Sequence, residues 1–181
     1  MSAKKVIGIA LLVVLIPPLC LAFLFTIPYI VSYRQPDPPR PEITYGEFPF
    51  RIEYEINGEL IIIEDSVICE FDGFFVSWGG DGKTRQWKVS FASGRKSEIF
   101  KSSAYLLIDE VDQICFSLGD GKYYMGDVER PYNQSLYAIK IIRGPGGSLR
   151  LPRIDSYELL NTYDIKIISY EISPPIVNSF K

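Results

Sequence analysis

The fold is decided by residues 48–64, FPFRIEYEINGELIIIE, in which alternating apolar and polar residues precede Asn57-Gly58 and an isoleucine-rich run follows it. Asn-Gly is typical of the two-residue turn of a β-hairpin, and alternation is the pattern of strands that bury one face. With such a turn, Ile52 lies opposite Ile63 on an apolar face, and charged residues occupy the other face. The stretch therefore predicts an antiparallel hairpin whose register is set by its turn.

Two further dipeptides of the same kind, Asp81-Gly82 and Asp120-Gly121, predict two more hairpins. In the first, Trp78 and Trp87 fall on the apolar face, where core packing is their expected role. In the second, Tyr124 falls on the outer face of its strand. Three hairpins that each separate into an apolar and a polar face indicate an antiparallel sheet with one face on a core.

The remaining segments add strands and one helix. Residues 135–143 and 164–172 predict two strands, whereas residues 103–112 fit a strand or a helix equally well. Asp155 and Glu158 have the spacing of a capping box, which predicts a short helix over residues 156–163. The expected fold is all-β or β-rich, an antiparallel sandwich or a curled sheet with this one helix, behind a single N-terminal transmembrane helix.

An apolar run of 26 residues without a charge extends from Val6 to Val31, longer than the roughly 20 residues that cross a bilayer core. Two lysines precede it, which predicts a signal anchor over residues 6–31 with residues 1–5 in the cytoplasm. A cleavable signal ending at Cys20-Leu21-Ala22 is the alternative. Cleavage there would leave a strongly apolar new N-terminus, so the uncleaved anchor is preferred.

Residues 32–41 form a linker in which four prolines favour an extended polyproline conformation: Pro36, Pro38, Pro39 and Pro41. At roughly 3.1 Å per residue, the seven residues 35–41 would act as a stiff spacer of about 20 Å. Residues 42–181 are then expected to form one β-rich domain outside the cytoplasm.

The charge of residues 42–181 bears on the partners of the chain. These residues carry 15 Lys and Arg against 21 Asp and Glu, a net charge of −6. Nucleic acid is a polyanion, so it is not an expected partner. The expected partners are membrane lipid through residues 6–31 and an envelope polymer or another membrane protein through the domain.

The sequence contains no His, which removes the commonest general base, the Ser-His-Asp triad and the usual zinc ligand. No cofactor is expected. Hydrolysis of a glycan by two carboxylates remains open. The carboxylates considered for it lie near predicted turns: Asp72, Asp81, Asp120, Asp127 and Glu129.

A calcium site and a disulfide are two further alternatives. Asp109, Glu110 and Asp112 offer oxygen ligands that Ca²⁺ accepts, although their spacing matches no EF-hand loop and a solvated strand end explains them equally well. Cys69 and Cys115 are the only two cysteines beyond the apolar run. Strand parity places Cys69 on the core face and Cys115 opposite to its apolar neighbours, which predicts two buried free thiols rather than a bridge.

Exposed aromatic rings next to acidic residues are the features chosen as a binding surface. Tyr124 and Tyr132 beside Asp120 and Asp127 are the candidates, and Tyr137 is a further surface tyrosine. The lack of His and of a nucleophile motif favours a non-catalytic binding or assembly module at the cell envelope. A membrane-anchored, carboxylate-based glycan hydrolase is the alternative.

Overall fold

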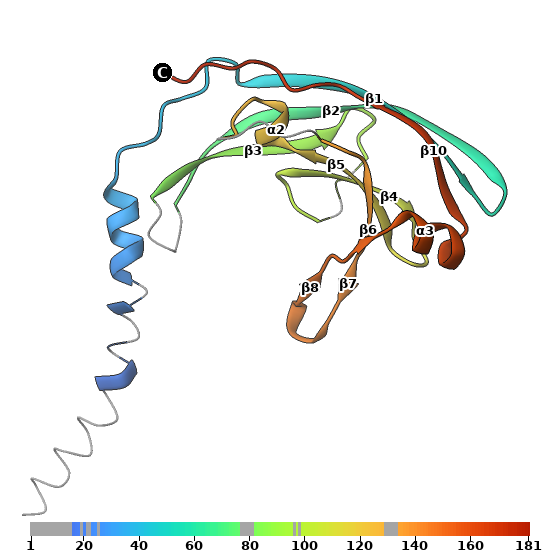
Figure 1. The fold of residues 1–181 in the computed structure, drawn as a ribbon. Coiled ribbons are helices and arrows are strands. Elements are labelled where there is room, and N and C mark those ends of the chain that lie inside the picture. The colour runs from blue at the N-terminus through green and yellow to red at the C-terminus, as the bar shows by residue number, and fades with distance from the viewer. Residues whose placement is uncertain are drawn as a thin grey trace, which may run out of the picture. The chain divides into compact units, whose positions relative to one another are not determined.

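The computed structural model describes residues 16–18, 20, 23–24, 26–76, 82–95, 97, 99–128 and 134–181, so the predicted span 6–31 lies partly outside the described residues. Internal contacts divide the chain into two compact units. Unit 1 comprises Met1–Arg40 and Phe74–Arg85, and unit 2 comprises Pro41–Gly73 and Gln86–Lys181. Residues 26–34 of unit 1 are helical (blue in Figure 1), and residues 36–40 have no regular structure. No helix within the described residues is both long enough and apolar enough to cross a membrane.

The first antiparallel sheet has the strand order β10-β1-β2-β3. Its strands are β1 (Tyr45–Ile56), β2 (Glu59–Val76), β3 (Lys83–Phe91) and β10 (Ile165–Ile172). Ile52 pairs with Ile63 as the sequence predicts. Asn57 and Gly58 both have positive φ, 52° and 78°, as a primed two-residue turn requires. The turn at Asp81-Gly82 lies partly outside the described residues.

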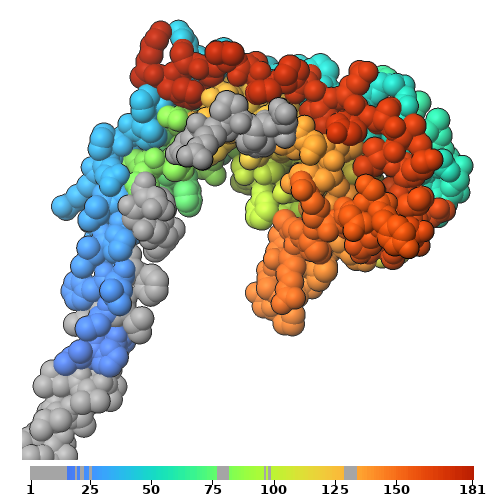
Figure 2. Space-filling view, viewed as in Figure 1, coloured from blue at the N-terminus to red at the C-terminus, as the bar shows by residue number. Residues whose placement is uncertain are grey.

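The second antiparallel sheet has the order β4-β5-β6-β9. Its strands are β4 (Ser103–Asp109), β5 (Ile114–Asp120), β6 (Tyr137–Lys140) and β9 (Arg153–Ile154). The ambiguous segment 103–112 is thus mostly strand. A separate ribbon of β7 (Ile142–Arg143) and β8 (Leu149–Arg150), joined through a 3₁₀ turn, projects from the rest of unit 2 (orange in Figures 1 and 2).

The predicted hairpin at Asp120-Gly121 is wrong. Gly121–Tyr124 forms a short helix, α2, and the Oδ1 atom of Asp120 accepts a hydrogen bond of 2.8 Å from the amide of Tyr123. Asp is favoured at a helix N-cap as well as in a turn, so the dipeptide alone does not choose between them. Strand β5 pairs instead with β4 and β6.

The helix predicted over residues 156–163 is confirmed as α3 (Ser156–Tyr163). The side chain of Asp155 accepts a hydrogen bond of 2.8 Å from the amide of Glu158, which caps the first turn. Asp164 ends the helix in the left-handed conformation, with φ of 52°. Strand β10 follows at once, in agreement with the predicted strand over residues 164–172.

One main apolar core receives side chains from both four-stranded sheets. In β1 every second residue from Phe48 to Tyr54 is buried. Tyr54 of the first sheet meets Phe116 of the second edge to face, with ring centroids 5.4 Å apart. Trp87, predicted on the apolar face, is 1% exposed in this core.

A second, smaller apolar cluster covers the other face of the second sheet. Cys115, Ile139 and Ile141 are buried there, whereas Cys69 belongs to the main core. Both cysteines are buried, and neither forms a disulfide in the described part of the chain. Burial raises the pKa of the Cys69 thiol to about 12, so this thiol stays protonated at neutral pH.

Candidate functional site

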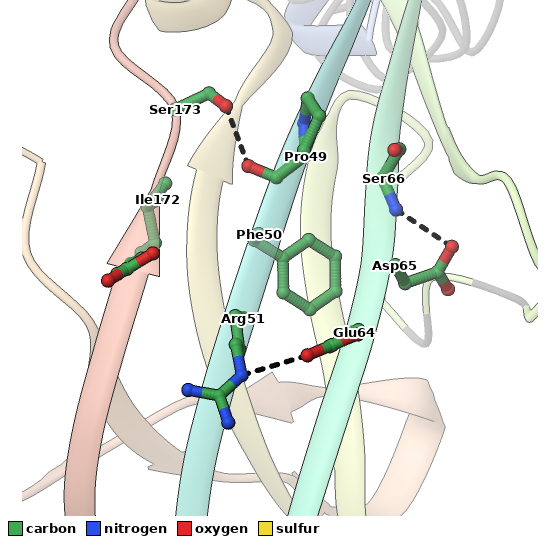
Figure 3. A pocket seen from close by; sticks show the side chains of 9 residues that line it. Pro49, Phe50, Arg51, Glu64, Asp65, Ser66, Ile172 and Ser173 are labelled. Carbon is green, nitrogen blue, oxygen red and sulfur yellow. Dashed lines mark hydrogen bonds and ion pairs between the residues drawn. The ribbon is translucent and has the colours of Figure 1, made fainter.

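Two hollows in unit 2 bring polar side chains together, one on each four-stranded sheet. The first is an open groove of about 550 Å³ over β1, β2 and β10, termed the charged groove (Figure 3). Its lining residues are Pro49, Phe50, Arg51, Glu64, Asp65, Ser66, Glu171, Ile172 and Ser173.

A row of three charged residues crosses the charged groove. Arg51 of β1 lies opposite Glu64 of β2 on one side and opposite Glu171 of β10 on the other. The Nε atom of Arg51 donates a hydrogen bond of 2.8 Å to Oε1 of Glu64 (Figure 3), and its Nη2 lies 2.5 Å from Oε1 of Glu53. The hydrogen bond to Glu64 raises the pKa of Arg51. A fixed cation therefore stands between the groove's two glutamates.

The remaining polar groups of the charged groove serve local structure. The Oδ1 atom of Asp65 accepts hydrogen bonds from the amides of Ser66 (2.8 Å) and Ser93 (3.0 Å), and its Oδ2 accepts one from the Ser93 hydroxyl. The Ser173 hydroxyl donates to the carbonyl of Pro49 at 2.6 Å (Figure 3). These bonds join the turn after β3 to β2 and the end of β10 to β1.

The second hollow, termed the tyrosine cleft, has a volume of about 240 Å³ and lies in unit 2 on the second sheet. Tyr105, Ser117 and Tyr137 are directly opposite one another on β4, β5 and β6. They share the sheet face of the smaller apolar cluster, which packs against both tyrosines. The lining residues are Ser103, Tyr105, Ser117, Gly119, Asp120, Gln134, Ser135, Tyr137 and Arg153.

The phenol of Tyr105 is a fixed hydrogen-bonding group in the tyrosine cleft. Burial raises its pKa, and neighbouring Tyr137 and Asp120 act in the same direction, whereas a hydrogen bond with the Ser117 side chain acts against them. The phenol is therefore protonated at neutral pH. The Ser117 side chain is itself buried, with 3% of the residue exposed.

One end of the cleft combines a cation with an aromatic ring. The guanidinium carbon of Arg153 lies 3.7 Å from the ring centroid of Tyr137. The planar guanidinium therefore makes a cation–π contact with the ring. Gly119, another lining residue, has φ of 115°, and a Cβ atom built there would lie 3.2 Å from Cδ of Gln134. Glycine at this position keeps the cleft open beside the Gln134 amide.

The structure separates the residues that the sequence grouped as a binding surface. Asp120 lines the tyrosine cleft, although one of its oxygens also caps α2. Asp127 accepts a hydrogen bond of 2.8 Å from Nε1 of Trp87 and lines neither hollow. Tyr124 is fully buried and donates to the carbonyl of Leu118 at 2.6 Å, so the outward orientation predicted for it is wrong. Tyr132 lies outside the described residues.

The other carboxylate candidates do not gather in either hollow. Asp72, exposed in β2, lines neither one, whereas Asp81 and Glu129 lie outside the described residues. The glutamates of the charged groove, Glu64 and Glu171, were not among the candidates, because neither is near a predicted turn residue.

The residues of the calcium alternative hold a turn together. Oδ1 of Asp109 accepts hydrogen bonds from the amides of Val111 (2.8 Å) and Asp112 (3.3 Å). Oδ1 of Asp112 lies 3.0 Å from the ammonium of Lys140, and Glu110 is exposed. Within the described part of the chain, no group of three or more His, Cys, Asp or Glu residues could hold a metal ion.

Sequence reasoning found Tyr137 as a surface tyrosine and Asp120 as a candidate, but it missed Tyr105, Ser117 and Arg153. These three residues come from three different strands, and their spacing along the chain carries no motif. The alternation of side chains along the strands could have found the two tyrosines. Tyr105 and Tyr137 share a sheet face with Cys115 once β4, β5 and β6 are paired in this order.

Searches against protein-family models, curated proteins and solved structures find no match to this chain. The chemistry of the two hollows and the character of the N-terminal segment are the features that bear on its function.

Proposed function

We propose that this chain is a single-pass membrane protein whose β-sandwich domain, outside the cytoplasm, binds a glycan of the cell envelope without cleaving it. Residues 6–31 act as an uncleaved signal anchor, residues 1–5 remain in the cytoplasm and residues 32–41 link the anchor to the domain. The tyrosine cleft is the ligand-binding site.

The sequence of the N-terminal segment supports the anchor. The 26 uncharged residues from Val6 to Val31 exceed the length that a bilayer core requires. Tyr29 and Tyr33 stack near the end of this run, with ring centroids 6.4 Å apart. Tyrosine is enriched where a transmembrane helix leaves the hydrocarbon.

The observation that carries the binding proposal is the composition of the tyrosine cleft. Two tyrosine rings, one Arg, three Ser and one Gln surround it, together with Asp120 as its one carboxylate among the described lining residues. Side chains that exchange hydrogen bonds with hydroxyl groups suit a polyhydroxylated ligand. Glycoside hydrolysis in its usual form needs two carboxylates across the scissile bond.

The size and charge of the cleft narrow the ligand class. At about 240 Å³ the cleft is smaller than the roughly 300 Å³ at which pockets for drug-sized ligands begin. It therefore suits one sugar ring of a longer chain. The guanidinium of Arg153 can donate two parallel hydrogen bonds to a carboxylate or phosphate group on that sugar.

A glycan hydrolase remains the second candidate because the charged groove contains two glutamates. Glu64 and Glu171 flank Arg51 on neighbouring strands, and two strand spacings of about 4.8 Å separate their Cα atoms by about 10 Å. However, the Glu64 side chain is 69% exposed and paired with Arg51. A general acid in a glycosidase is instead a carboxyl held protonated by an apolar environment.

The test is binding of the full-length chain, in detergent or nanodiscs, to a panel of purified envelope polysaccharides. Tyr137→Ala should lose most of the binding. Tyr157→Ala is the matched control, because Tyr157 is 78% exposed on α3 and lies outside the cleft. Release of new reducing ends that stops in Glu64→Gln or Glu171→Gln would replace the binding proposal with the hydrolase.

Protease treatment of intact cells tests the topology. The domain should be degraded while a membrane-bound fragment of a few kilodaltons survives. Full protection of the domain would contradict the orientation, and recovery of a soluble, secreted domain would contradict the anchor.

A further inference from the structure

Within unit 1, the linker is bound to the described flank of the β2–β3 hairpin. The ammonium of Lys83, the first residue of β3, lies 2.7 Å from Oδ1 of Asp37. The same ammonium lies 5.5 Å from the ring centroid of Tyr33, in the last turn of the helical residues 26–34. One lysine thus contacts both the end of that helix and the linker that follows.

Two further contacts extend this attachment. The Nη1 atom of Arg85 donates a hydrogen bond of 3.2 Å to the carbonyl of Pro39. Gly82 is buried with φ of 86°, and a methyl group at this position would collide with the side chain of Gln35. The linker therefore contacts Gly82 and the first residues of β3 at three successive places.

These contacts limit the distance between the end of the anchor helix and Lys83. Asp37 is three residues beyond Arg34, the last helical residue, so it lies within about 11 Å of the helix end, even if the chain is fully extended. The polar layer on each side of the hydrocarbon core is about 5–8 Å thick. If residues 6–31 cross the bilayer, Tyr33 is two residues beyond the span, and the Lys83 ammonium, 5.5 Å from its ring centroid, lies beside the headgroup layer.

The charge distribution of the two units fits a phosphate-bearing surface. From residue 32 onward, unit 1 carries two Asp and four cations, Arg34, Arg40, Lys83 and Arg85. Unit 2 carries 13 Lys and Arg against 20 Asp and Glu, a net charge of −7. The excess of positive charge is thus confined to the unit that contains the anchor, where basic residues next to a membrane attract anionic headgroups.

The same unit exposes aromatic side chains. Phe75, near the end of β2, is 49% exposed, and Tyr33 is 62% exposed. Phe75 occupies the face of its strand that the sequence pattern assigns to polar residues. Aromatic residues placed among cations are typical of segments that lie in the membrane interface.

We propose that the described flanks of the β2–β3 hairpin in unit 1, residues 74–76 and 82–85, form a second membrane contact, which lies in the lipid headgroup layer beside the end of the anchor. Phe75 and Tyr33 lie among the headgroups, and Lys83 and Arg85 lie within reach of lipid phosphates. This inference rests on the proposed anchor, and it is independent of any glycan bound in the tyrosine cleft.

The experiment places an environment-sensitive fluorophore on Thr84→Cys in the full-length chain, reconstituted in vesicles of phosphatidylcholine with phosphatidylglycerol. Cys20→Ser removes the exposed native thiol, whereas Cys69 and Cys115 are buried. Lipids brominated near the headgroup serve as quenchers. A probe on Ala92→Cys, an exposed residue that follows β3 in unit 2, gives the reference value.

The proposal predicts that the Thr84 probe emits at shorter wavelength and is quenched more strongly than the Ala92 probe. Lys83→Gln should reduce this quenching because it removes the contact with Asp37. Lys88→Gln is the matched control: Lys88 is exposed on the same strand and paired with Glu70, but it belongs to unit 2. It should leave the quenching unchanged.

Flotation of the same vesicles separates the two proposals. One outcome is that the protein floats but its Thr84 probe is quenched no more than the Ala92 probe. This outcome supports the anchor and overturns the hairpin contact. A short-wavelength shift without lipid quenching indicates burial against protein and also overturns it. Protein that fails to float with the vesicles overturns the anchor, and the hairpin contact with it.

Discussion

The two four-stranded sheets bury their residues in different ways, although both contribute to the main core. In β1 of the first sheet, buried residues alternate with partly or fully exposed ones. In β5 of the second sheet, six successive residues from Ile114 to Gly119 are all buried. The difference arises because the second sheet has an apolar cluster on each face, whereas the outer face of the first sheet carries the charged groove. A cleft supported by packed side chains is better pre-organised for a ligand than a row of exposed charges.

The largest effect is expected from truncating Phe116, at the centre of β5. Phe116→Ala should lower the free energy of unfolding by about 3–5 kcal/mol, because Phe116 is fully buried and packs against Tyr54 of the opposite sheet. Chemical denaturation measures this loss. A loss below about 1 kcal/mol, the size of a typical substitution, would contradict a shared core between the sheets.

A second effect is expected from pH, through Cys69 on the core face of the first sheet. Burial raises the pKa of this thiol to about 12, from an ordinary value of 9.0 that applies to the unfolded chain. The folded state therefore keeps a proton that the unfolded state loses. This contribution to stability is complete below pH 9 and is lost as the pH rises toward about 12.

Thermal unfolding at a series of alkaline pH values checks this effect. The melting temperature of the wild type should fall more steeply above pH 9 than that of Cys69→Ala, in which the titrating thiol is absent. Parallel slopes for the two proteins would show that Cys69 is accessible to solvent.

A smaller effect is expected on the outer face of the second sheet. Ile139→Val removes one methylene from the smaller apolar cluster and should cost about 0.5–1.5 kcal/mol. Chemical denaturation should detect this cost. A neutral result would indicate that the cluster beneath the tyrosine cleft is loosely packed, and the contrast between the two sheets would then weaken.

The smallest effect is expected in the charged groove. Arg51→Gln removes the ion pairs with Glu53 and Glu64, and exposed pairs of this kind contribute little to stability because water screens them. Denaturation at low and high salt should give a difference between variant and wild type that shrinks with added salt. A large loss of stability that does not depend on salt would assign the groove a structural role.

The contrast between the sheets also explains which parts of the fold the sequence predicts. The β1–β2 register follows from Asn57-Gly58 because a two-residue turn fixes which residues lie opposite one another. Asp120-Gly121 predicts the wrong element because Tyr123, Tyr124 and Met125 are all buried, and consecutive buried residues carry no strand period. The capping of α3 is local in sequence, so it is predicted correctly.

The candidate site is less predictable than the fold for a related reason. Tyr105, Tyr137 and Arg153 meet only because β4, β5, β6 and β9 lie in that order, and no turn dipeptide in the sequence sets that order. Asp120 is found because it stands beside a turn signal. Tyr124 was misplaced together with its hairpin, since successive side chains alternate between two faces in a strand but not in a helix.

The most direct test compares glycan binding by two double variants of the full-length chain, one on each sheet. The account predicts that Tyr137→Ala with Arg153→Gln loses binding to envelope polysaccharide, whereas Glu64→Gln with Glu171→Gln binds as the wild type does. Circular dichroism should confirm that both variants remain folded. Loss of binding in the glutamate variant, with binding kept in the cleft variant, would contradict the account and place the ligand in the charged groove.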